Sequence, residues 1–381
     1  MTGPSANSRS LGSASTLRVP AWLWIGLSCL VVAGCAEAPD LGERAVGEVY
    51  RGELLRIMVP FGPGGGSDTW ARLIAPHLQR HLPEGARIQV VNVPGATSVA
   101  GANEYALRTR PDGRTIFVSA GSTFFVYLLG EPMVRYEFRD LEPLLASPSG
   151  GVVFVRPDLG VSSPRELSRV GERLLYGGIS ATGNDLLPLL AFEILGLEVT
   201  PILGYTSKGA TRIAFQQGET NIEYQTTPAY LTNVVPLVEA GEAVPLFSFG
   251  MVDGQGQVIP DPAAPDLPTV ADAYRAIHGR APSGAAWEAY VAVLAAGVTM
   301  QKVLWIRQEA PASAVAELRE AIADLIEDPA FLEPARRQLG DYPFLLADEI
   351  DEALRAGVGM SPEALEWLKD FLRERFQVDR I

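Results

Sequence analysis

Short apolar runs alternate with segments of helical periodicity along most of the chain. The runs Leu54–Val59, Ile88–Val93 and Thr115–Ser119 have the length and composition of buried strands, and each ends at a loop rich in small or turn-forming residues. Between the first two runs, apolar side chains recur at helical spacing over residues 70–78, and a further helix is predicted over residues 99–107. Alternating strands and helices of this kind predict parallel α/β sheets.

The same pattern starts again after residue 150. A strand is predicted at Gly151–Val155 and another at residues 174–176, and the second is followed by a polar loop, Ser180–Asp185, and an apolar helix. We therefore predict two α/β lobes, with one crossing of the chain near residues 146–150 and a return near residues 247–251. The predicted bounds are 53–148 and 251–381 for lobe 1 and 149–250 for lobe 2.

The N-terminus has the layout of an export signal. Positive charge precedes the uncharged apolar run 21–32, which is shorter than the roughly 20 residues needed to span a bilayer. The run ends in Val-Ala-Gly before Cys35, which resembles the bacterial lipobox, so residues 1–35 are predicted to be a lipoprotein signal peptide with Cys35 as the lipidated residue. A plain signal peptide or short anchor with a chance cysteine is the alternative. Residues 36–52, with their Gly, Pro and charges, are predicted to be a tether.

Composition excludes several classes of protein. The 31 Lys+Arg against 45 Asp+Glu give a net charge of −14, which disfavours nucleic acid because phosphate binding needs a basic surface. Cys29 and Cys35 are the two cysteines, so the body of the chain has no disulfide, thiol nucleophile or cysteine metal site. His77 and His81 stand four apart on a predicted helix, but no third ligand is evident nearby. We expect neither a metal nor a cofactor.

Catalytic motifs give no support for an enzyme. The sequence has no Gly-x-Ser-x-Gly elbow and no histidine near a strand-end loop, so a serine would lack the base that activates it. The glycine-rich segment after residue 60 lacks the Lys-Ser/Thr of a phosphate-binding loop and the spacing of a dinucleotide fingerprint. We therefore expect that the protein is not an enzyme, and an exported hydrolase remains a weak alternative.

Five short motifs resemble one family of receptors. They are Val59–Asp68 (VPFGPGGGSD), Val91–Ala96, Pro111–Thr115, Tyr205–Gly209 and Asp266–Val270, and they occur in the family's order between about residues 54 and 340. In this the chain resembles the TctC or Bug solute-binding receptors of tripartite tricarboxylate transporters. The resemblance implies a two-lobed type II periplasmic binding protein (a Venus-flytrap fold) with a hinge of two strands. It also implies a monomer that holds a carboxylate between its lobes and works with membrane permease subunits.

The loops of the resemblance suit an anion. A helix N-terminus leaves backbone N–H groups unpaired and adds a partial positive charge, and glycines let several N–H groups turn toward one point. Residues 64–67 fit this description in lobe 1, and residues 180–184 fit it in lobe 2. The predicted ligand-binding residues are Phe61, Gly64, Gly65, Gly66, Ser67, Asp68, Ser122, Thr123, Ser180, Thr182, Gly183, Asn184, Tyr205 and Lys208.

Several of these residues have a second interpretation. Asp68 is an acid beside a proposed anion site, so it either caps the helix or ties loop N–H groups in place, and contact with a ligand amine is the alternative. Lys208 either pairs with the ligand or lies at the surface, and Tyr205 is either pocket wall or core. Trp70 either packs in the core or stacks on a ring-bearing ligand. The apolar stretch Leu186–Leu190 predicts either a more apolar pocket wall or a better-buried helix.

Two segments depart from the family pattern. Ala285–Thr299 is an apolar helical insertion, and Ser361–Phe376 is a C-terminal stretch longer than usual. Each either covers the hinge or docks on a partner. The sequence thus predicts an exported, lipid-anchored receptor that captures a mono-, di- or tricarboxylate on the periplasmic or cell-surface side of a membrane. A carboxylate sensor that signals through a partner is the alternative with the same lobes.

Overall fold

The computed structural model describes residues 41–379 and 381, apart from 65, 254 and 359. The predicted signal peptide and Cys35 lie outside this part of the chain. No helix within it is long and apolar enough to cross a membrane.

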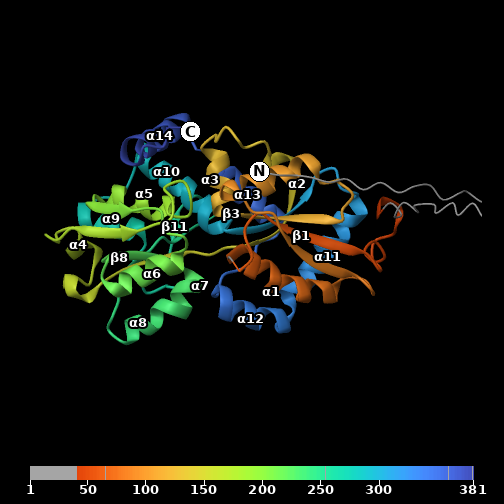
Figure 1. The fold of residues 1–381 in the computed structure, drawn as a ribbon, viewed down its shortest axis with the longest axis horizontal. Coiled ribbons are helices and arrows are strands. Elements are labelled where there is room, and N and C mark those ends of the chain that lie inside the picture. The colour runs from red at the N-terminus through yellow and green to blue at the C-terminus, as the bar shows by residue number, and fades with distance from the viewer. Residues whose placement is uncertain (1–40, 65, 254, 359, 380) are drawn as a thin grey trace, which may run out of the picture. The chain divides into compact units, whose positions relative to one another are not determined.

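The first of two five-stranded sheets has the strand order β2-β1-β3-β12-β4, and β1 and β3 of this sheet are labelled in Figure 1. Its strands are β1 (Leu54–Val59), β2 (Arg87–Asn92), β3 (Thr115–Ala120), β4 (Leu141–Ser147) and β12 (Lys302–Arg307). Strand β1 is parallel to β2 and β3, whereas β12 is antiparallel to both of its neighbours. The carboxyl ends of β1, β3 and β4 therefore lie at the same edge of the sheet as the first residue of β12.

Helices cover both faces of this sheet. They are α1 (Gly66–His81), α2 (Val99–Arg108), α3 (Gly121–Leu128), α11 (Ala312–Glu327), α12 (Pro329–Leu339) and α13 (Ala347–Val358). Side chains alternate between the faces of a strand, and β12 shows this alternation clearly. Leu304 and Ile306 belong to the same buried cluster as Trp70 of α1, whereas Val303 and Trp305 pack in the cluster on the other face.

The second sheet has the order β7-β6-β8-β5-β9. Its strands are β5 (Gly151–Val155), β6 (Leu174–Gly177), β7 (Val199–Ile202), β8 (Ile222–Thr226) and β9 (Val244–Ser248). The helical segments between these strands are α4 (Pro164–Leu167), α5 (Leu186–Leu195), α6 (Lys208–Gln217), α7 (Thr227–Ala229), the π-helix η5 (Tyr230–Val234) and α8 (Val235–Glu239). The prediction of two α/β units from the restarting strand–helix pattern is confirmed.

The chain passes from the first sheet to the second where the sequence predicted it, in a first crossing that follows Ser147. It leaves the second sheet after Ser248, forms a hairpin of β10 (Met251–Val252) and β11 (Val258–Ile259), and rejoins the first sheet only at β12. Tyr342 ties the first crossing to its surroundings, because its hydroxyl accepts from Gly150 N at 2.9 Å and donates to Asp261 Oδ1 at 2.5 Å.

The predicted lobe boundary at residue 251 is wrong in one respect. Helix α9 (Val270–His278) follows that boundary, yet it packs against α4, α5 and β9 of the second sheet. The bridge between Ser248 and Thr269 fixes the start of α9 beside β9. Lobe 2 therefore continues through α9, because the apolar side of this helix covers a face of the second sheet.

The described part of the predicted tether is also different from the prediction. Leu41, Val49 and Tyr50 are fully buried. The carboxylate of Glu317 on α11 accepts from Gly47 N at 2.6 Å, Val49 N at 2.8 Å and Tyr50 N at 3.0 Å. Residues 41–50 therefore belong to the folded lobe 1, since a buried acid on α11 satisfies their backbone.

The apolar insertion forms helices that cover the hinge, and the C-terminal stretch forms a helix that packs on the insertion. The insertion is α10 (Ala285–Leu294) and the π-helix η6 (Ala295–Thr299), and the C-terminal stretch is α14 (Pro362–Phe376). Helix α10 packs against α5 of lobe 2 and against α13 and α14 (Figure 1). At the first crossing, Ser149 N donates to Val298 O at 3.0 Å. Of the two interpretations of the insertion, packing over the hinge is confirmed.

Candidate functional site

The loops singled out by the sequence lie at matching edges of the two sheets. The segment 60–65 follows β1 and leads into α1, and Ser122 stands in the first turn of α3 directly after β3. In the second sheet, residues 178–185 follow β6, and residues 203–207 follow β7. The crossing segments join these same edges. In doubly wound α/β sheets this edge is the usual place for a ligand.

The buried carboxylate of Asp68 fixes the conformation of the first loop. Its carboxylate accepts from Gly64 N at 2.8 Å, from Asn92 Nδ2 at 2.9 Å and from Arg72 Nε at 2.9 Å. The Arg72 guanidinium, with the Gly64 and Asn92 hydrogen bonds, lowers the pKa of Asp68 to about 2. The prediction that Asp68 ties the loop in place is confirmed. The Gly64 N–H is consequently committed to Asp68, while Gly65 lies outside the described residues.

The remaining residues of the first loop surround this network. Phe61 is half-buried, and its carbonyl accepts from Asn92 Nδ2 at 3.0 Å. Gly66 is exposed and begins α1, and Ser67 is buried in the first turn of that helix. Trp70 is 2% exposed and packs in the core, so its predicted alternative role as a stacking surface for the ligand is wrong.

Ser122 and Thr123 occupy the first turn of α3, where sequence reasoning placed a loop. Thr123 is fully buried, and its hydroxyl accepts from Ala120 N at 3.1 Å, so it caps its own helix. Ser122 is 7% exposed. The neighbouring Gly121 is closely packed, because a Cβ there would lie 3.1 Å from Gly297 Cα of η6. The insertion thus covers the start of α3.

The second loop is held by another buried acid, Asp185. Its carboxylate accepts from Ile179 N at 2.7 Å and Ser180 N at 3.2 Å, and Tyr176 Oη donates to the same carboxylate. Ser180 Oγ lies 3.2 Å from Thr182 Oγ1. Gly183 is buried, and its N–H donates to Ser180 O at 3.2 Å. Asp185 therefore fixes the conformation of the second loop by accepting its backbone N–H groups, as Asp68 does in the first loop.

Lys208 is held within lobe 2 by acidic partners. Its ammonium lies 2.6 Å from Glu223 Oε1 and 3.4 Å from Asp185 Oδ1. It also donates to Gly177 O at 3.3 Å and stands 5.0 Å from the centre of the Tyr224 ring. Burial raises the pKa of Glu223, and the ammonium opposes that rise. Lys208 is therefore already paired with acids of lobe 2, and its contact with a ligand stays a prediction.

Tyr205 is half-buried and reaches toward the surface. Its hydroxyl donates to Glu219 Oε2 at 3.4 Å. The apolar stretch Leu186–Leu190 is buried throughout in α5, which favours the second of its two interpretations, a better-buried helix.

One small cavity lies between the lobes. Its lining comes from α3, from the first crossing, from the second loop of lobe 2 and from η6, and it includes Asn184, Leu187 and Gln301. Its volume of about 10 Å³ corresponds to about one water. The Asn184 amide oxygen is buried without a hydrogen-bond partner. Of the predicted ligand-binding residues, Asn184 is the one that lines this cavity.

Sequence reasoning missed Lys302 and Gln301. Lys302 is the first residue of β12 and pairs in register with Ala120 on one side and Ser147 on the other. It therefore lies at the carboxyl edge of the first sheet. The sequence carried no signal for this position, because only the antiparallel insertion of β12 between β3 and β4 brings its first residue to that edge.

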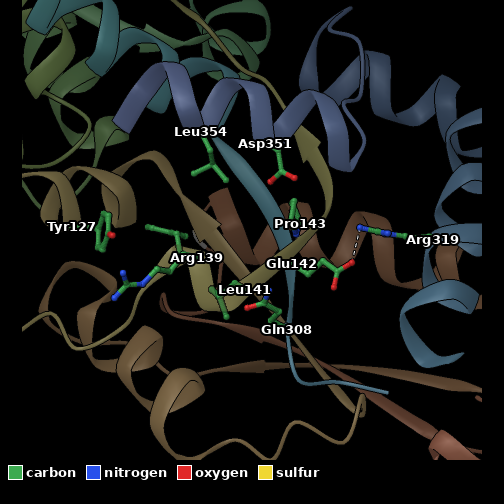
Figure 2. A pocket seen from close by; sticks show the side chains of 10 residues that line it. Tyr127, Arg139, Leu141, Glu142, Pro143, Gln308, Arg319, Asp351 and Leu354 are labelled. Carbon is green, nitrogen blue, oxygen red and sulfur yellow. Dashed lines mark ion pairs between the residues drawn. The ribbon is translucent and has the colours of Figure 1, made fainter. Parts of the chain in front are cut away.

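A larger pocket of about 730 Å³ lies elsewhere (Figure 2). Leu141 and Gln308 mark it as the opposite edge of the first sheet, since they stand at the start of β4 and after the end of β12. Its ion pair joins Arg319 to Glu142 at 2.7 Å, and α13 passes over it (Figure 2). Its lining contains none of the predicted ligand-binding residues. Among the described residues, no three His, Cys, Asp or Glu gather as a metal site.

No protein-family model matches the chain. A UPF0065 protein of Bordetella pertussis is 26% identical over 223 residues, which are 57% of this chain and 64% of that protein. A UPF0065 protein of Agrobacterium vitis, from the ttuE–ttuC' intergenic region, is 25% identical over 296 residues, which are 74% of each chain.

Solved structures share the fold over most of their length. A TctC solute-binding protein from Polaromonas has a TM-score of 0.60 at 16% identity, with 84% of this chain and 98% of that one covered. MatC of Rhodopseudomonas palustris with bound malate has a TM-score of 0.55 at 20% identity, with 83% and 98% covered. An R. palustris protein with adipate has a TM-score of 0.58 at 20% identity, with 83% and 97% covered. The predicted resemblance to TctC and Bug proteins and the periplasmic-binding-protein fold are confirmed.

Proposed function

We propose that this chain is an extracytoplasmic solute-binding receptor that captures a small carboxylate between its lobes and delivers it to a membrane permease. The observation that carries the proposal is the position of polar loops from both sheets at the edges that the crossing segments join. Each loop is fixed from inside by a buried aspartate, Asp68 or Asp185. A loop that is already ordered loses less entropy when it binds a ligand.

The fold neighbours support a carboxylate as the ligand. Two of them were solved with malate and with adipate, which are both dicarboxylates. In the present chain, helix α1 begins at Gly66 beside the first loop, and a helix N-terminus stabilises an anion through its unpaired N–H groups and its dipole. We propose that this site binds its ligand without catalysis.

A ligand screen tests the proposal. Malate, adipate and a set of mono- and tricarboxylates are added to the purified protein, and the midpoint of thermal unfolding is measured. A ligand at 100 times its Kd is expected to stabilise the protein by about 2.7 kcal/mol, which is a shift of a few degrees. The absence of a shift with every acid, checked by calorimetric titration, would refute the receptor.

The membrane anchor is a separate part of the proposal. We expect Cys35 to carry lipid that holds the receptor at a membrane surface. Cys35→Ser should abolish incorporation of a labelled fatty acid and release the protein from the membrane fraction, whereas Cys29→Ser should leave both unchanged. Labelling that survives Cys35→Ser would exclude the lipid anchor and leave the receptor proposal standing.

A further inference from the structure

Lys302 carries a charge that no acid neutralises in the described part of the chain. Its Nζ donates to Gln301 O at 3.0 Å and to Gln301 Oε1 at 2.8 Å, which are both uncharged acceptors. An ammonium has three donors, so one remains after these two bonds. Burial lowers the pKa of Lys302 to about 8, and no neighbouring carboxylate opposes that shift. Lysines placed among protein atoms without a counter-ion are costly, and they are rare outside functional sites.

The position of Lys302 is that of the predicted anion site. Residues two apart on a strand share a face, so Lys302 lies on the same face as Leu304 and Ile306, whose cluster includes Trp70 of α1. Helix α1 covers this face and begins at the same edge of the sheet, because it follows β1 through the first loop. Lys302 is half-buried at this edge.

Two acids on the elements that pack near Lys302 already have partners, and Asp261 beside the first crossing is buried and bonded to Tyr342. Asp68 in the first turn of α1 is paired with Arg72. Glu142 of β4 pairs with Arg319 of α11 at the opposite edge of the sheet. The charge of Lys302 is therefore available for an external anion.

Lobe 2, in contrast to lobe 1, has a neutralised lysine and an unpaired hydrogen-bond acceptor. Its lysine, Lys208, is matched by Glu223 and Asp185. Its buried acceptor atom Asn184 Oδ1, on the lining of the small cavity between the lobes, has no hydrogen-bond partner. Unpaired buried acceptors disfavour a second carboxylate and favour a ligand group that donates a hydrogen bond.

From these contrasts we infer that Lys302 is the cation that binds the ligand's carboxylate, and that the preferred ligand carries its charge at one end only. The inference rests on the proposed function, since it assigns the ligand class of the same site. The ligand is a monocarboxylate whose other end is neutral and bears a hydroxyl or amide donor. The carboxylate sits at the edge of the first sheet, and the neutral end faces Asn184.

Matched ligands and variants test this inference by calorimetric titration. The probes are hexanoate, 6-hydroxyhexanoate and adipate, which share a chain length and differ at one end. The proteins are the wild type, Lys302→Gln, Lys302→Arg, and Lys369→Gln as a control on the distant helix α14. We expect 6-hydroxyhexanoate to bind at least tenfold more tightly than adipate. We expect Lys302→Gln to weaken its binding about ten- to a hundredfold, Lys302→Arg to retain most of it, and Lys369→Gln to change nothing.

The pH dependence provides a readout that a purely structural lysine would not give. Because the pKa of Lys302 is about 8, the ammonium loses its proton as the pH rises through that value. Affinity of the wild type should therefore be constant below pH 7 and fall between pH 8 and 10, whereas Lys302→Arg should bind equally across this range. This comparison holds even where Lys302→Gln fails to fold.

The outcomes separate the two proposals. Binding of no probe or other carboxylate by the wild type refutes the receptor and this inference together. Tighter binding of adipate than of 6-hydroxyhexanoate, unchanged affinity in Lys302→Gln, or an affinity independent of pH up to 10 overturns the inference and leaves the receptor standing.

Discussion

At the scale of single residues, two buried aspartates explain why each polar loop has one conformation. Asp68 and Asp185 each accept backbone N–H groups of the loop beside them, at Gly64 and at Ile179. A buried carboxylate is tolerated because these bonds and a cationic neighbour compensate the loss of water. In lobe 1 that neighbour is Arg72, and in lobe 2 it is Lys208.

Removing the Asp68 charge should destabilise the protein in a manner that depends on pH. Asp68→Asn loses the ion pair with Arg72 and is expected to lower the free energy of unfolding by about 1–3 kcal/mol at pH 7. The pKa of Asp68 is about 2, below its ordinary value of 3.8. Its stabilisation is therefore complete above about pH 4 and is lost as the pH falls through 2.

Urea denaturation of the wild type and Asp68→Asn at pH 7 and at pH 2.5 measures this effect. The difference between the two proteins should shrink at the lower pH. Thr69→Ala, at the exposed next position, is the control and should unfold like the wild type at both values. If the free energies of unfolding of the wild type and Asp68→Asn differed equally at both pH values, the charge of Asp68 would not be the cause of the destabilisation.

At the scale of elements, the crossing from β4 to β5 is the most constrained segment. A Cβ at Gly150 would lie 2.0 Å from Asp261 Oδ2 and 2.7 Å from Tyr342 Oη. The Tyr342 hydroxyl contacts Gly150, Asp261 and Thr227 at once. This one hydroxyl thus joins the crossing to the segment before α9 and to the segment after α12.

Tyr342→Phe should leave a buried backbone group without a partner. Gly150 N would lose its acceptor, and Asp261 Oδ1 would keep only its bond from Ala263 N, so the free energy of unfolding is expected to fall by about 1–3 kcal/mol. Tyr205→Phe is the matched control, since its hydroxyl makes one long bond near the surface, and it should cost less than about 0.5 kcal/mol. Equal stabilities in urea denaturation would contradict a tying role for Tyr342.

At the scale of the whole molecule, one buried core joins the two lobes. It includes Phe124 beside the first sheet, Leu190 beside the second, and Tyr290 of α10 and Leu372 of α14 between them. Asp40–Ile381 accordingly forms one unit by its contacts. In a receptor with a free hinge each lobe would have its own core, so α10 and α14 are expected to make the lobes unfold together.

Scanning calorimetry of two core variants checks this cooperativity. Leu372→Ala in α14 and Leu318→Ala in the core of the first sheet each remove a fully buried side chain and are expected to cost about 2–5 kcal/mol. The wild type should show one transition, and both variants should lower it as a whole. Two transitions, with each variant shifting a different one, would mean that the lobes unfold independently.

The sequence by itself determined the local structure and the order of the elements. Apolar runs such as Leu54–Val59 and Gly151–Val155 form strands with the predicted ends. Ser163 caps its helix before Pro164, because capping depends on a few neighbouring residues. The first crossing was also predictable, since the strand–helix pattern stops and restarts there, whereas the return to the first sheet at β12 was not.

Only the tertiary structure decided which charges are free. Lys208 and Lys302 look alike in sequence, yet one is paired with Glu223 and Asp185 and the other bonds only Gln301. The difference arises because β8 supplies Glu223 beside α6, whereas β12 enters the first sheet in reverse and leaves Lys302 at its carboxyl edge. Local patterns fix where strands begin and end, but strand order and direction depend on contacts between residues far apart in the chain. The charge balance of the site follows from those distant contacts.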